Sequence, residues 1–194
     1  MKPATYQDAL ELDLTPAQIF TFFHDLEKWF RLNPQWQVLA FVSNAPPQAG
    51  STFALEVEYD RQEKKAAYRG LITQWEPHRS LTVRLEGEET REMTIEVLDA
   101  RYLSLLKYRE TSQHPLSTRD KMELHLWLES VGNYLQISHR TSIWSRLYKW
   151  FLDRYWLKMS PSGRRTAFFI VVAEGLSLLF FLCILLWILI FKRI

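Results

Sequence analysis

The feature that most constrains this chain is an apolar run near its C-terminal end, TAFFIVVAEGLSLLFFLCILLWILIF, at residues 166–191. The run is 26 residues long and contains one charged side chain. A helix of that length extends about 39 Å, and the hydrocarbon core of a bilayer is about 30 Å thick. A helix in the core of a soluble protein is rarely this long. The sequence therefore predicts one transmembrane helix.

Basic residues flank this run unequally. Residues 140–165, before the run, contain seven lysines and arginines and one aspartate, whereas Lys192 and Arg193 follow it. The cytoplasmic side of a membrane helix carries the excess of positive charge. The N-terminal stretch MKPATYQDALELDL has no apolar segment of signal-peptide length. We therefore expect a single-pass membrane protein with a cytoplasmic N-terminal domain, in the inner membrane if the source is bacterial.

Composition divides the chain into a domain at 1–159, a basic linker at 160–165, the transmembrane helix at 166–191 and a short tail at 192–194. Residues 1–139 contain 15 lysines and arginines and 20 aspartates and glutamates. The domain therefore lacks the basic surface that nucleic-acid binding requires, and we exclude nucleic acid as a partner. The single cysteine, Cys183, lies in the apolar run, so we expect neither a disulfide framework nor a cysteine metal cluster.

Hydrophobic periodicity within the domain predicts a strand, two short helices, a long antiparallel sheet and a final helix. Thr15-Pro16 is typical of an N-cap followed by proline at the first helical position, and Asn33-Pro34 is expected to end the second helix. Val131-Gly132-Asn133 is typical of a hairpin turn. The predicted elements are a strand at 4–14, helices from residue 16 and at 26–31, strands at 37–42, 53–59, 67–75, 81–86, 93–97, 102–109, 122–128 and 134–141, and a helix at 143–159.

Three segments resemble one fold family: LDLTPAQIFTFFHDLEKWFRLNP at 12–34, GLITQWEPHRSL at 70–81 and LWLESVGNYLQISHR at 126–140. With the order of elements, they resemble the START-like (SRPBCC) superfamily, which includes polyketide cyclase/dehydrase and lipid-transport proteins. The resemblance implies an α+β helix-grip fold, in which a curved antiparallel sheet surrounds a long C-terminal helix. It also implies an apolar tunnel, which in relatives holds lipids, sterols, polyketides or quinones.

Strand parity predicts which side chains face that tunnel, with the helix at 143–159 closing it. The candidate cavity residues are Phe20, Phe53, Leu55, Val57, Tyr59, Leu81, Val83, Leu124, Leu126, Leu135, Ile137 and His139. Two interpretations of His139 stay open: a hydrogen-bonded structural histidine, or a contact with the polar end of a ligand.

No catalytic or metal-binding constellation is recognisable in the sequence. It contains no glycine-rich phosphate loop, no GxSxG elbow and no histidine and carboxylate set with metal-ligand spacing. His24, His78, His114 and His125 are scattered, and surface positions explain them most simply. We therefore expect no catalytic residue, no metal and no cofactor, and a non-enzymatic role is favoured.

Two features indicate further contacts at the membrane. Aromatic side chains favour the interface and cations favour lipid phosphates, so the candidate membrane-surface residues are Arg146, Lys149, Trp150, Arg154, Trp156, Lys158, Arg164 and Arg165. Glu174 is the single ionisable group in the apolar run. It lies either in the headgroup region or against a partner helix, where Gly175 and Ser177 would permit close approach.

These observations favour a membrane-anchored, non-enzymatic module that binds or transfers a hydrophobic ligand, a lipid or a quinone. Tethering would keep the ligand and its cavity in the same small volume. The alternative is an accessory or assembly subunit of a larger membrane complex, with the domain as a scaffold and other transmembrane subunits as partners. An enzyme of the cyclase or hydrolase kind is a third possibility, and it rests on fold analogy alone.

Overall fold

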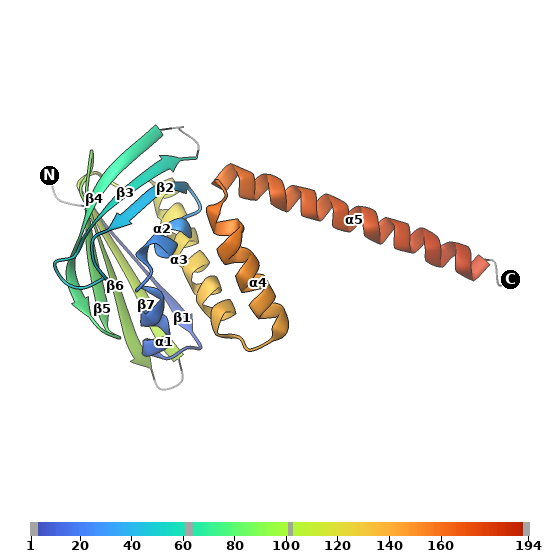
Figure 1. The fold of residues 1–194 in the computed structure, drawn as a ribbon, viewed down its shortest axis with the longest axis horizontal. Coiled ribbons are helices and arrows are strands. Elements are labelled where there is room, and N and C mark those ends of the chain that lie inside the picture. The colour runs from blue at the N-terminus through green and yellow to red at the C-terminus, as the bar shows by residue number, and fades with distance from the viewer. Residues whose placement is uncertain (1–3, 61–63, 101–102, 192–194) are drawn as a thin grey trace.

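The computed structural model describes residues 4–60, 64–100 and 103–191 (Figure 1). Its largest element is a seven-stranded antiparallel sheet with the strand order β1-β7-β6-β5-β4-β3-β2. The strands are β1 (Ala4–Leu12), β2 (Trp36–Ser43), β3 (Thr52–Tyr59), β4 (Lys64–Glu76), β5 (Ser80–Glu86), β6 (Arg91–Ala100) and β7 (Leu103–Ser112). The strands predicted up to residue 109 are confirmed. The predicted tail, with Lys192 and Arg193, lies outside the described residues.

The helices are α1 (Pro16–Phe22), α2 (Leu26–Arg31), α3 (Thr118–His139), α4 (Ile143–Arg154) and α5 (Pro161–Phe191), with the 3-10 turn η1 (Trp156–Lys158) before α5. Side-chain caps begin α1 and α2, and the cap at Thr15 was predicted. Thr15 and Gln18 form a capping box, in which the Thr15 hydroxyl accepts from the Gln18 N–H and the Gln18 side chain accepts from the Thr15 N–H. Asp25 accepts a hydrogen bond of 3.0 Å from the Lys28 N–H.

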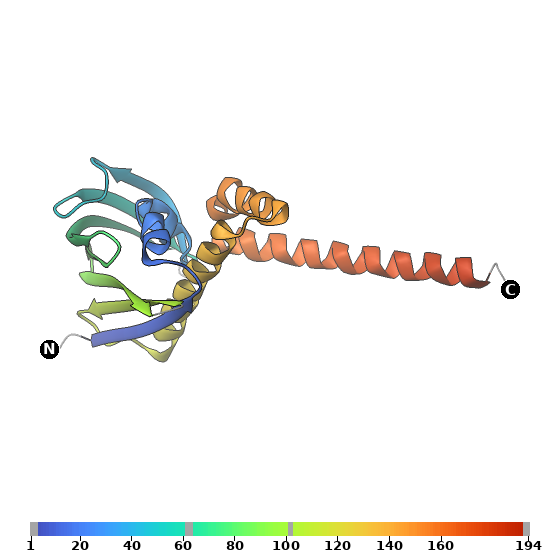
Figure 2. The same ribbon diagram turned by 90° about the horizontal axis from the view of Figure 1, so that it is seen from below.

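Helix α3 lies on the concave side of the sheet, and two predictions for this region are wrong. The residues predicted as strands at 122–128 and 134–141 belong almost entirely to α3. The helix that the sheet surrounds is therefore α3 rather than the predicted helix at 143–159 (Figure 2). The element order still matches the implied architecture, because a curved antiparallel sheet surrounds a long helix that follows the last strand.

Local features explain why this segment is helical. Ser117 and Asp120 form a capping box, and Gly132 lies where a Cβ would come within 2.0 Å of Leu10 Cδ2. Gly132 therefore permits α3 to approach β1 closely and does not form a turn. The buried residues of α3 follow helical spacing: Leu124, Trp127, Leu128, Val131, Tyr134 and Leu135. The alternation at 122–128 arises because two exposed apolar side chains, Met122 and Leu126, alternate with the buried Leu124 and Leu128. Together they imitate the apolar face of a strand.

Helix α4 packs on α3, outside the sheet, and α5 projects away from the domain (Figure 1). The predicted helix at 143–159 is confirmed as α4 and η1, but it does not close the interior. Ser160 Oγ accepts from the Gly163 N–H at 3.1 Å, and Pro161 begins α5, so the predicted linker at 160–165 is mostly the first turn of α5. Helix α5 is long and apolar enough to cross a membrane, and its apolar side chains are exposed.

Asp60, Ser162, Arg164 and Arg165 join the start of α5 to the domain, and we call this group the α5 clamp. The Asp60 carboxylate accepts from the Ser162 N–H at 2.9 Å and pairs with Arg165, and Arg164 Nη2 donates to the Arg31 carbonyl at 3.0 Å. Burial, with the charge of Arg31, lowers the pKa of Arg164 to about 10, so the guanidinium stays charged at neutral pH. Arg164 Nε and Nη2 thus donate to carbonyl groups within the protein, which does not support the predicted lipid contact of Arg164.

Aromatic rings fill the interior between the sheet and α3. Trp127 stacks on Trp29 with ring centroids 5.4 Å apart, and its indole N–H donates to the Trp29 carbonyl at 3.0 Å. Phe30 also stacks on Trp29, with ring centroids 5.0 Å apart, and Trp36 stacks on Tyr68 at 6.2 Å. Most of the space in which a long tunnel was expected is therefore occupied by side chains.

We expect Trp127→Ala to destabilise the chain by about 3–5 kcal/mol, because it removes a buried ring and leaves a cavity. Leu126→Ala, one position earlier, should change the free energy of unfolding by less than about 1 kcal/mol, because Leu126 is 41% exposed and Trp127 2%. Denaturation of the detergent-solubilised chain, followed by near-UV circular dichroism, measures both. Equal losses would contradict the helical placement of these residues.

Candidate functional site

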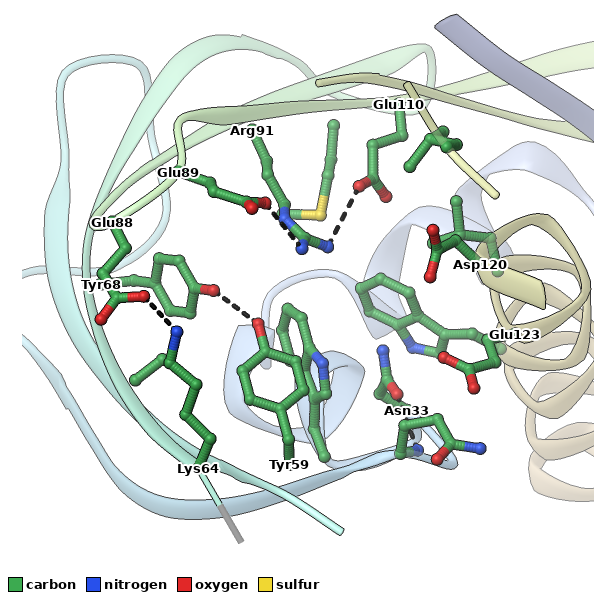
Figure 3. A pocket seen from close by; sticks show the side chains of 17 residues that line it. Asn33, Tyr59, Lys64, Tyr68, Glu88, Glu89, Arg91, Glu110, Asp120 and Glu123 are labelled. Carbon is green, nitrogen blue, oxygen red and sulfur yellow. Dashed lines mark hydrogen bonds and ion pairs between the residues drawn. The ribbon is translucent and has the colours of Figure 1, made fainter. Parts of the chain in front are cut away.

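A pocket of about 230 Å³ lies at one end of the sheet, between β3, β4, β6 and β7 and the first turns of α3 (Figure 3). It is smaller than the usual range for ligand pockets, about 300–1,000 Å³. Both aromatic and charged side chains line it. They include Trp36, Tyr59, Lys64, Ala66, Tyr68, Glu88, Glu89, Arg91, Met93, Glu110, Asp120, Glu123, Leu124 and Trp127.

Arg91 and Glu110 form the polar wall that the sheet contributes to this pocket. Arg91 Nη1 lies 3.5 Å from Glu110 Oε1, and Arg91 Nη2 donates to Glu89 at 3.2 Å. Glu110 is 1% exposed and accepts a short hydrogen bond from the Tyr108 hydroxyl. Burial raises the pKa of the Glu110 carboxyl above its usual value, although the charge of Arg91 and the Tyr108 hydrogen bond oppose that rise.

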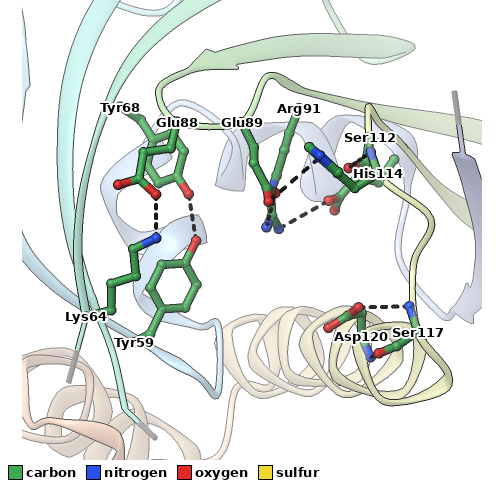
Figure 4. Close-up of polar contacts among 11 residues, drawn as sticks. Tyr59, Lys64, Tyr68, Glu88, Glu89, Arg91, Ser112, His114, Ser117 and Asp120 are labelled. Atoms are coloured by element: carbon green, nitrogen blue, oxygen red, sulfur yellow. Dashed lines mark hydrogen bonds and ion pairs between the residues drawn. The ribbon is translucent and has the colours of Figure 1, made fainter. Parts of the chain in front are cut away.

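Polar pairs continue around the mouth of the pocket (Figure 4). The hydroxyls of Tyr59 and Tyr68 are 2.6 Å apart, and Lys64 pairs with Glu88. Burial, followed by the hydrogen bond to Tyr68, raises the pKa of Tyr59, so the phenol stays neutral at physiological pH. The pocket thus presents the neutral phenol of Tyr59 and aromatic faces beside the half-buried guanidinium of Arg91.

Two buried atoms of this wall have unused bonding capacity. Among the described residues, Arg91 Nε and Glu110 Oε1 have no hydrogen-bond partner. Buried polar groups are nearly always satisfied by protein, water or ligand. Glu110 Oε1 already lies in the ion pair with Arg91, so Arg91 Nε is the buried donor of this wall whose partner is missing from the described part of the chain. A bound molecule could therefore accept from Arg91 while its apolar surface contacts Trp36 and Trp127.

The predicted cavity residues divide into a packed core and a small part that reaches this pocket. Tyr59 and Leu124 line the pocket. The others that are buried belong to the hydrophobic core: Phe20, Phe53, Leu55, Val57, Leu81, Val83 and Leu135. The strand residues of this set, Phe53, Leu55, Val57, Leu81 and Val83, point inward as the parity predicted, but aromatic rings rather than a tunnel lie beside them.

Three predicted cavity residues of α3 lie elsewhere, because the segment is a helix and strand parity does not apply to it. Leu126 faces solvent, and Ile137 lines an outer groove between α3, α4 and the start of α5. His139 Nδ1 lies 3.0 Å from the Leu135 carbonyl oxygen, in agreement with a structural histidine. None of the three contacts the pocket of Arg91.

Arg91, Glu110, Tyr68 and Trp127 line the pocket but were not predicted as site residues. A signal for the first two was present, since Arg91 has the same parity as Met93 and Ile95, and Glu110 has that of Tyr108. A charged residue at an inward position of a strand indicates either a buried ion pair or a ligand contact. No local signal places Trp127, because its position depends on the helical state of α3.

Histidine and carboxylate side chains form no further chemical centre in the part of the chain that the structure describes. No group of three or more histidine, cysteine, aspartate or glutamate residues there could hold a metal ion. His125 Nδ1 lies 2.7 Å from Asp8, which accepts from the Tyr6 hydroxyl at 2.8 Å, but His125 is exposed. This pair therefore joins α3 to β1 at the surface.

We expect Glu110→Gln to change how stability depends on pH. The pKa of Glu110 is raised in the folded chain, so above the ordinary glutamate value of about 4.3 the unfolded state loses its proton first. The free energy of unfolding of the parent chain should therefore fall, relative to Glu110→Gln, as the pH rises through this window. Denaturation between about pH 4.5 and pH 8 measures it, with the exposed Glu86→Gln as control. Parallel curves for all three proteins would contradict the raised pKa.

Comparisons with known proteins identify the fold. No protein-family model matches the chain, and the comparison with curated proteins gives no match. Among solved structures, DR_A0006 from Deinococcus radiodurans is 12% identical with a TM-score of 0.55, over 70% of this chain and 99% of that one. Ara h 8.0201 is 12% identical with a TM-score of 0.53, over 69% and 98%. A START superfamily protein from Mycobacterium smegmatis is 16% identical with a TM-score of 0.51, over 68% and 94%. At these identities the likeness concerns the fold alone, and the chain has the helix-grip fold.

Proposed function

We propose that this chain is a membrane-anchored, non-enzymatic module that binds a hydrophobic ligand, a lipid or a quinone, by its compact polar end. The observation that carries the proposal is the pair of unsatisfied buried atoms, Arg91 Nε and Glu110 Oε1, in an aromatic-lined pocket. A quinone carbonyl or a lipid ester oxygen accepts from a guanidinium. The size of the pocket limits the enclosed part to a ring or head group, with the apolar tail outside.

Helix α5 supports the membrane anchor. Its side chains from Phe168 to Phe181 are exposed, and no residue of the most apolar 18-residue stretch of the candidate span Pro161–Leu185 is buried within the protein. A helix in the core of a soluble domain would be covered by other elements, and exposing this much apolar surface to water is unfavourable. The excess of lysine and arginine before α5 favours a cytoplasmic domain.

The position of the pocket suits exchange of a ligand with the bilayer. Tyr59 lines the pocket, and the next residue, Asp60, belongs to the α5 clamp. The Asp60 N–H donates to the carbonyl of Gln35, a second lining residue, at 3.0 Å. The pocket and the start of α5 are therefore neighbours, which shortens the path between the bilayer and the site.

A scaffold role in a larger membrane complex remains the second candidate, because aromatic side chains pack most of the interior. Glu174, Gly175 and Ser177 of α5 would then lie against a partner helix. The ligand and the scaffold proposals differ in what accompanies the purified chain, a small molecule or another transmembrane subunit.

We expect the full chain to stay in the membrane pellet after alkaline carbonate washing, because α5 is embedded in lipid. A chain that ends at Lys158 should be released or bind only peripherally. Protease added to the cytoplasmic side should digest the domain. Recovery of the full chain in the supernatant would contradict the anchor, and protection from protease would reverse the proposed topology.

We expect Ala66→Phe to abolish ligand retention, because Ala66 lines the pocket and a phenyl ring would fill much of about 230 Å³. Ala67→Phe is the matched control, since Ala67 is exposed on the same strand and does not line the pocket. Native mass spectrometry of the detergent-extracted proteins, with analysis of extracted lipids and quinones, measures retention. A ligand retained equally by both variants would place its site elsewhere, and a co-purifying subunit without a ligand would favour the scaffold.

A further inference from the structure

Helix α4 contacts the rest of the domain along one narrow stripe and exposes the remainder. Leu152 is its one buried residue. Asp153 holds this stripe against α3, because it accepts a hydrogen bond of 2.7 Å from the Tyr134 hydroxyl of α3. Within α4, it also accepts from Lys149 at 2.8 Å. Ile143 and Trp144 are 81% and 78% exposed, which is unusual for large apolar side chains in a folded domain.

The outward line of α4 combines apolar and cationic side chains. Ile143, Leu147, Trp150 and Arg154 follow spacings of four, three and four residues, so they share one face, opposite Leu152. All four are exposed. This composition, with aliphatic and indole groups beside cations, is typical of helices that lie in a membrane interface.

The α5 clamp fixes the direction in which α5 leaves the domain, and this direction determines where the exposed face of α4 lies. Figures 1 and 2 show α4 on the side of the domain from which α5 projects, and in Figure 1 the two helix axes are oblique to one another. An α5 that crosses a bilayer with a tilt would therefore bring α4 close to the membrane surface. The face of α4 that points away from the domain then points toward the lipid.

We propose that α4 is an interfacial helix, which lies on the bilayer surface beside the point where α5 enters it, and that the α5 clamp holds it there. The occupant of its exposed face is a phospholipid interface that contains anionic headgroups. This inference rests on the proposed membrane anchor. It goes beyond that anchor, because it assigns the domain a fixed orientation on the membrane.

Charge selects lipid as the occupant. Arg146, Arg154 and Lys158 are exposed and, within the described part of the chain, form no ion pair with an acidic residue. An anionic leaflet attracts each such cation, and the attraction corresponds to about fivefold in membrane binding. Only η1 and three further residues separate α4 from α5, so an α5 embedded in lipid would keep α4 close to the bilayer surface. Trp156 was predicted to face lipid with Trp150, but it packs against the core, and Trp150 alone is exposed.

The test measures the depth of single-cysteine positions in the full chain, reconstituted in vesicles, on a Cys183→Ser background. Leu147→Cys reports on α4, Phe180→Cys on α5, and Val42→Cys on the end of β2 that lies far from α5 (Figure 1). Each cysteine carries a polarity-sensitive fluorophore, and lipids with nitroxides in the headgroup or along the acyl chain quench it. The vesicles are phosphatidylcholine with and without phosphatidylglycerol.

We expect the probe at residue 147 to be quenched several-fold more strongly than the probe at residue 42, mainly by headgroup nitroxides and more strongly with phosphatidylglycerol. The probe at residue 180 should be quenched by acyl-chain nitroxides. If residue 180 is quenched and residue 147 is no more quenched than residue 42, α4 does not dock although the anchor holds. If residue 180 is not quenched, the anchor itself fails. A probe at residue 147 that is shielded from water but not quenched by lipid would assign this face to a protein partner, including a second copy of the chain.

Two variants separate the contributions of charge and of the clamp. Arg146→Gln with Arg154→Gln should lower the quenching at residue 147 in anionic vesicles and leave residue 180 unchanged. Asp60→Asn, which weakens the α5 clamp, should lower this quenching in both vesicle types, with Glu58→Gln on β3, two residues earlier, as control. Near-UV circular dichroism verifies that each variant is folded. Unchanged quenching in Asp60→Asn would overturn the role of the clamp, and unchanged quenching in the arginine pair would overturn the role of charge.

Discussion

The packing of Trp127, a residue of α3, against the concave side of the sheet is the interaction on which the rest of the domain depends. Its ring stacks on Trp29, and its indole N–H donates to the Trp29 carbonyl, so one side chain joins α3 to α2 without leaving a buried donor unpaired. With Phe30 and Trp36, it fills the concave side of the sheet. The open space is therefore confined to one end, where the lining changes from apolar to charged side chains.

The charged wall of that pocket is costly for folding, which is an argument for a function. A buried arginine and glutamate pair is often less stable than apolar residues of similar volume, because both charges lose water. Here the pair is also incompletely hydrogen-bonded, since Arg91 Nε and Glu110 Oε1 are unsatisfied among the described residues. A bound molecule that accepts from Arg91 would supply the missing hydrogen bond. The same groups that weaken the empty domain would then contribute to affinity and orientation.

The α5 clamp links this pocket to the proposed membrane anchor. Without it, a helix attached by a flexible linker would leave the domain free to rotate above the bilayer. With Arg164 and Arg165 bonded to the domain, α5, α4 and the pocket keep one relative arrangement. On this view the domain rests on the membrane through α4, and the pocket lies next to the point where α5 starts. This arrangement also limits which surfaces remain accessible to a partner subunit.

The sequence by itself determined the elements that depend on neighbouring residues: the apolar helix, the capped helices α1 and α2, the seven strands and the helix at Ile143–Arg154. It also supported the helix-grip architecture, because the first strand, the helix pair and the strands after it follow from local periodicity, although the turn expected at Val131-Gly132-Asn133 lies within α3. Only the tertiary structure decided that residues 122–139 are helical, since alternation at 122–128 fits a strand and a helix face equally well. The pocket and the α5 clamp were likewise decided by the tertiary structure alone. Arg91 meets Glu110, and Asp60 meets Arg165, only after chain folding brings together residues that no sequence spacing relates.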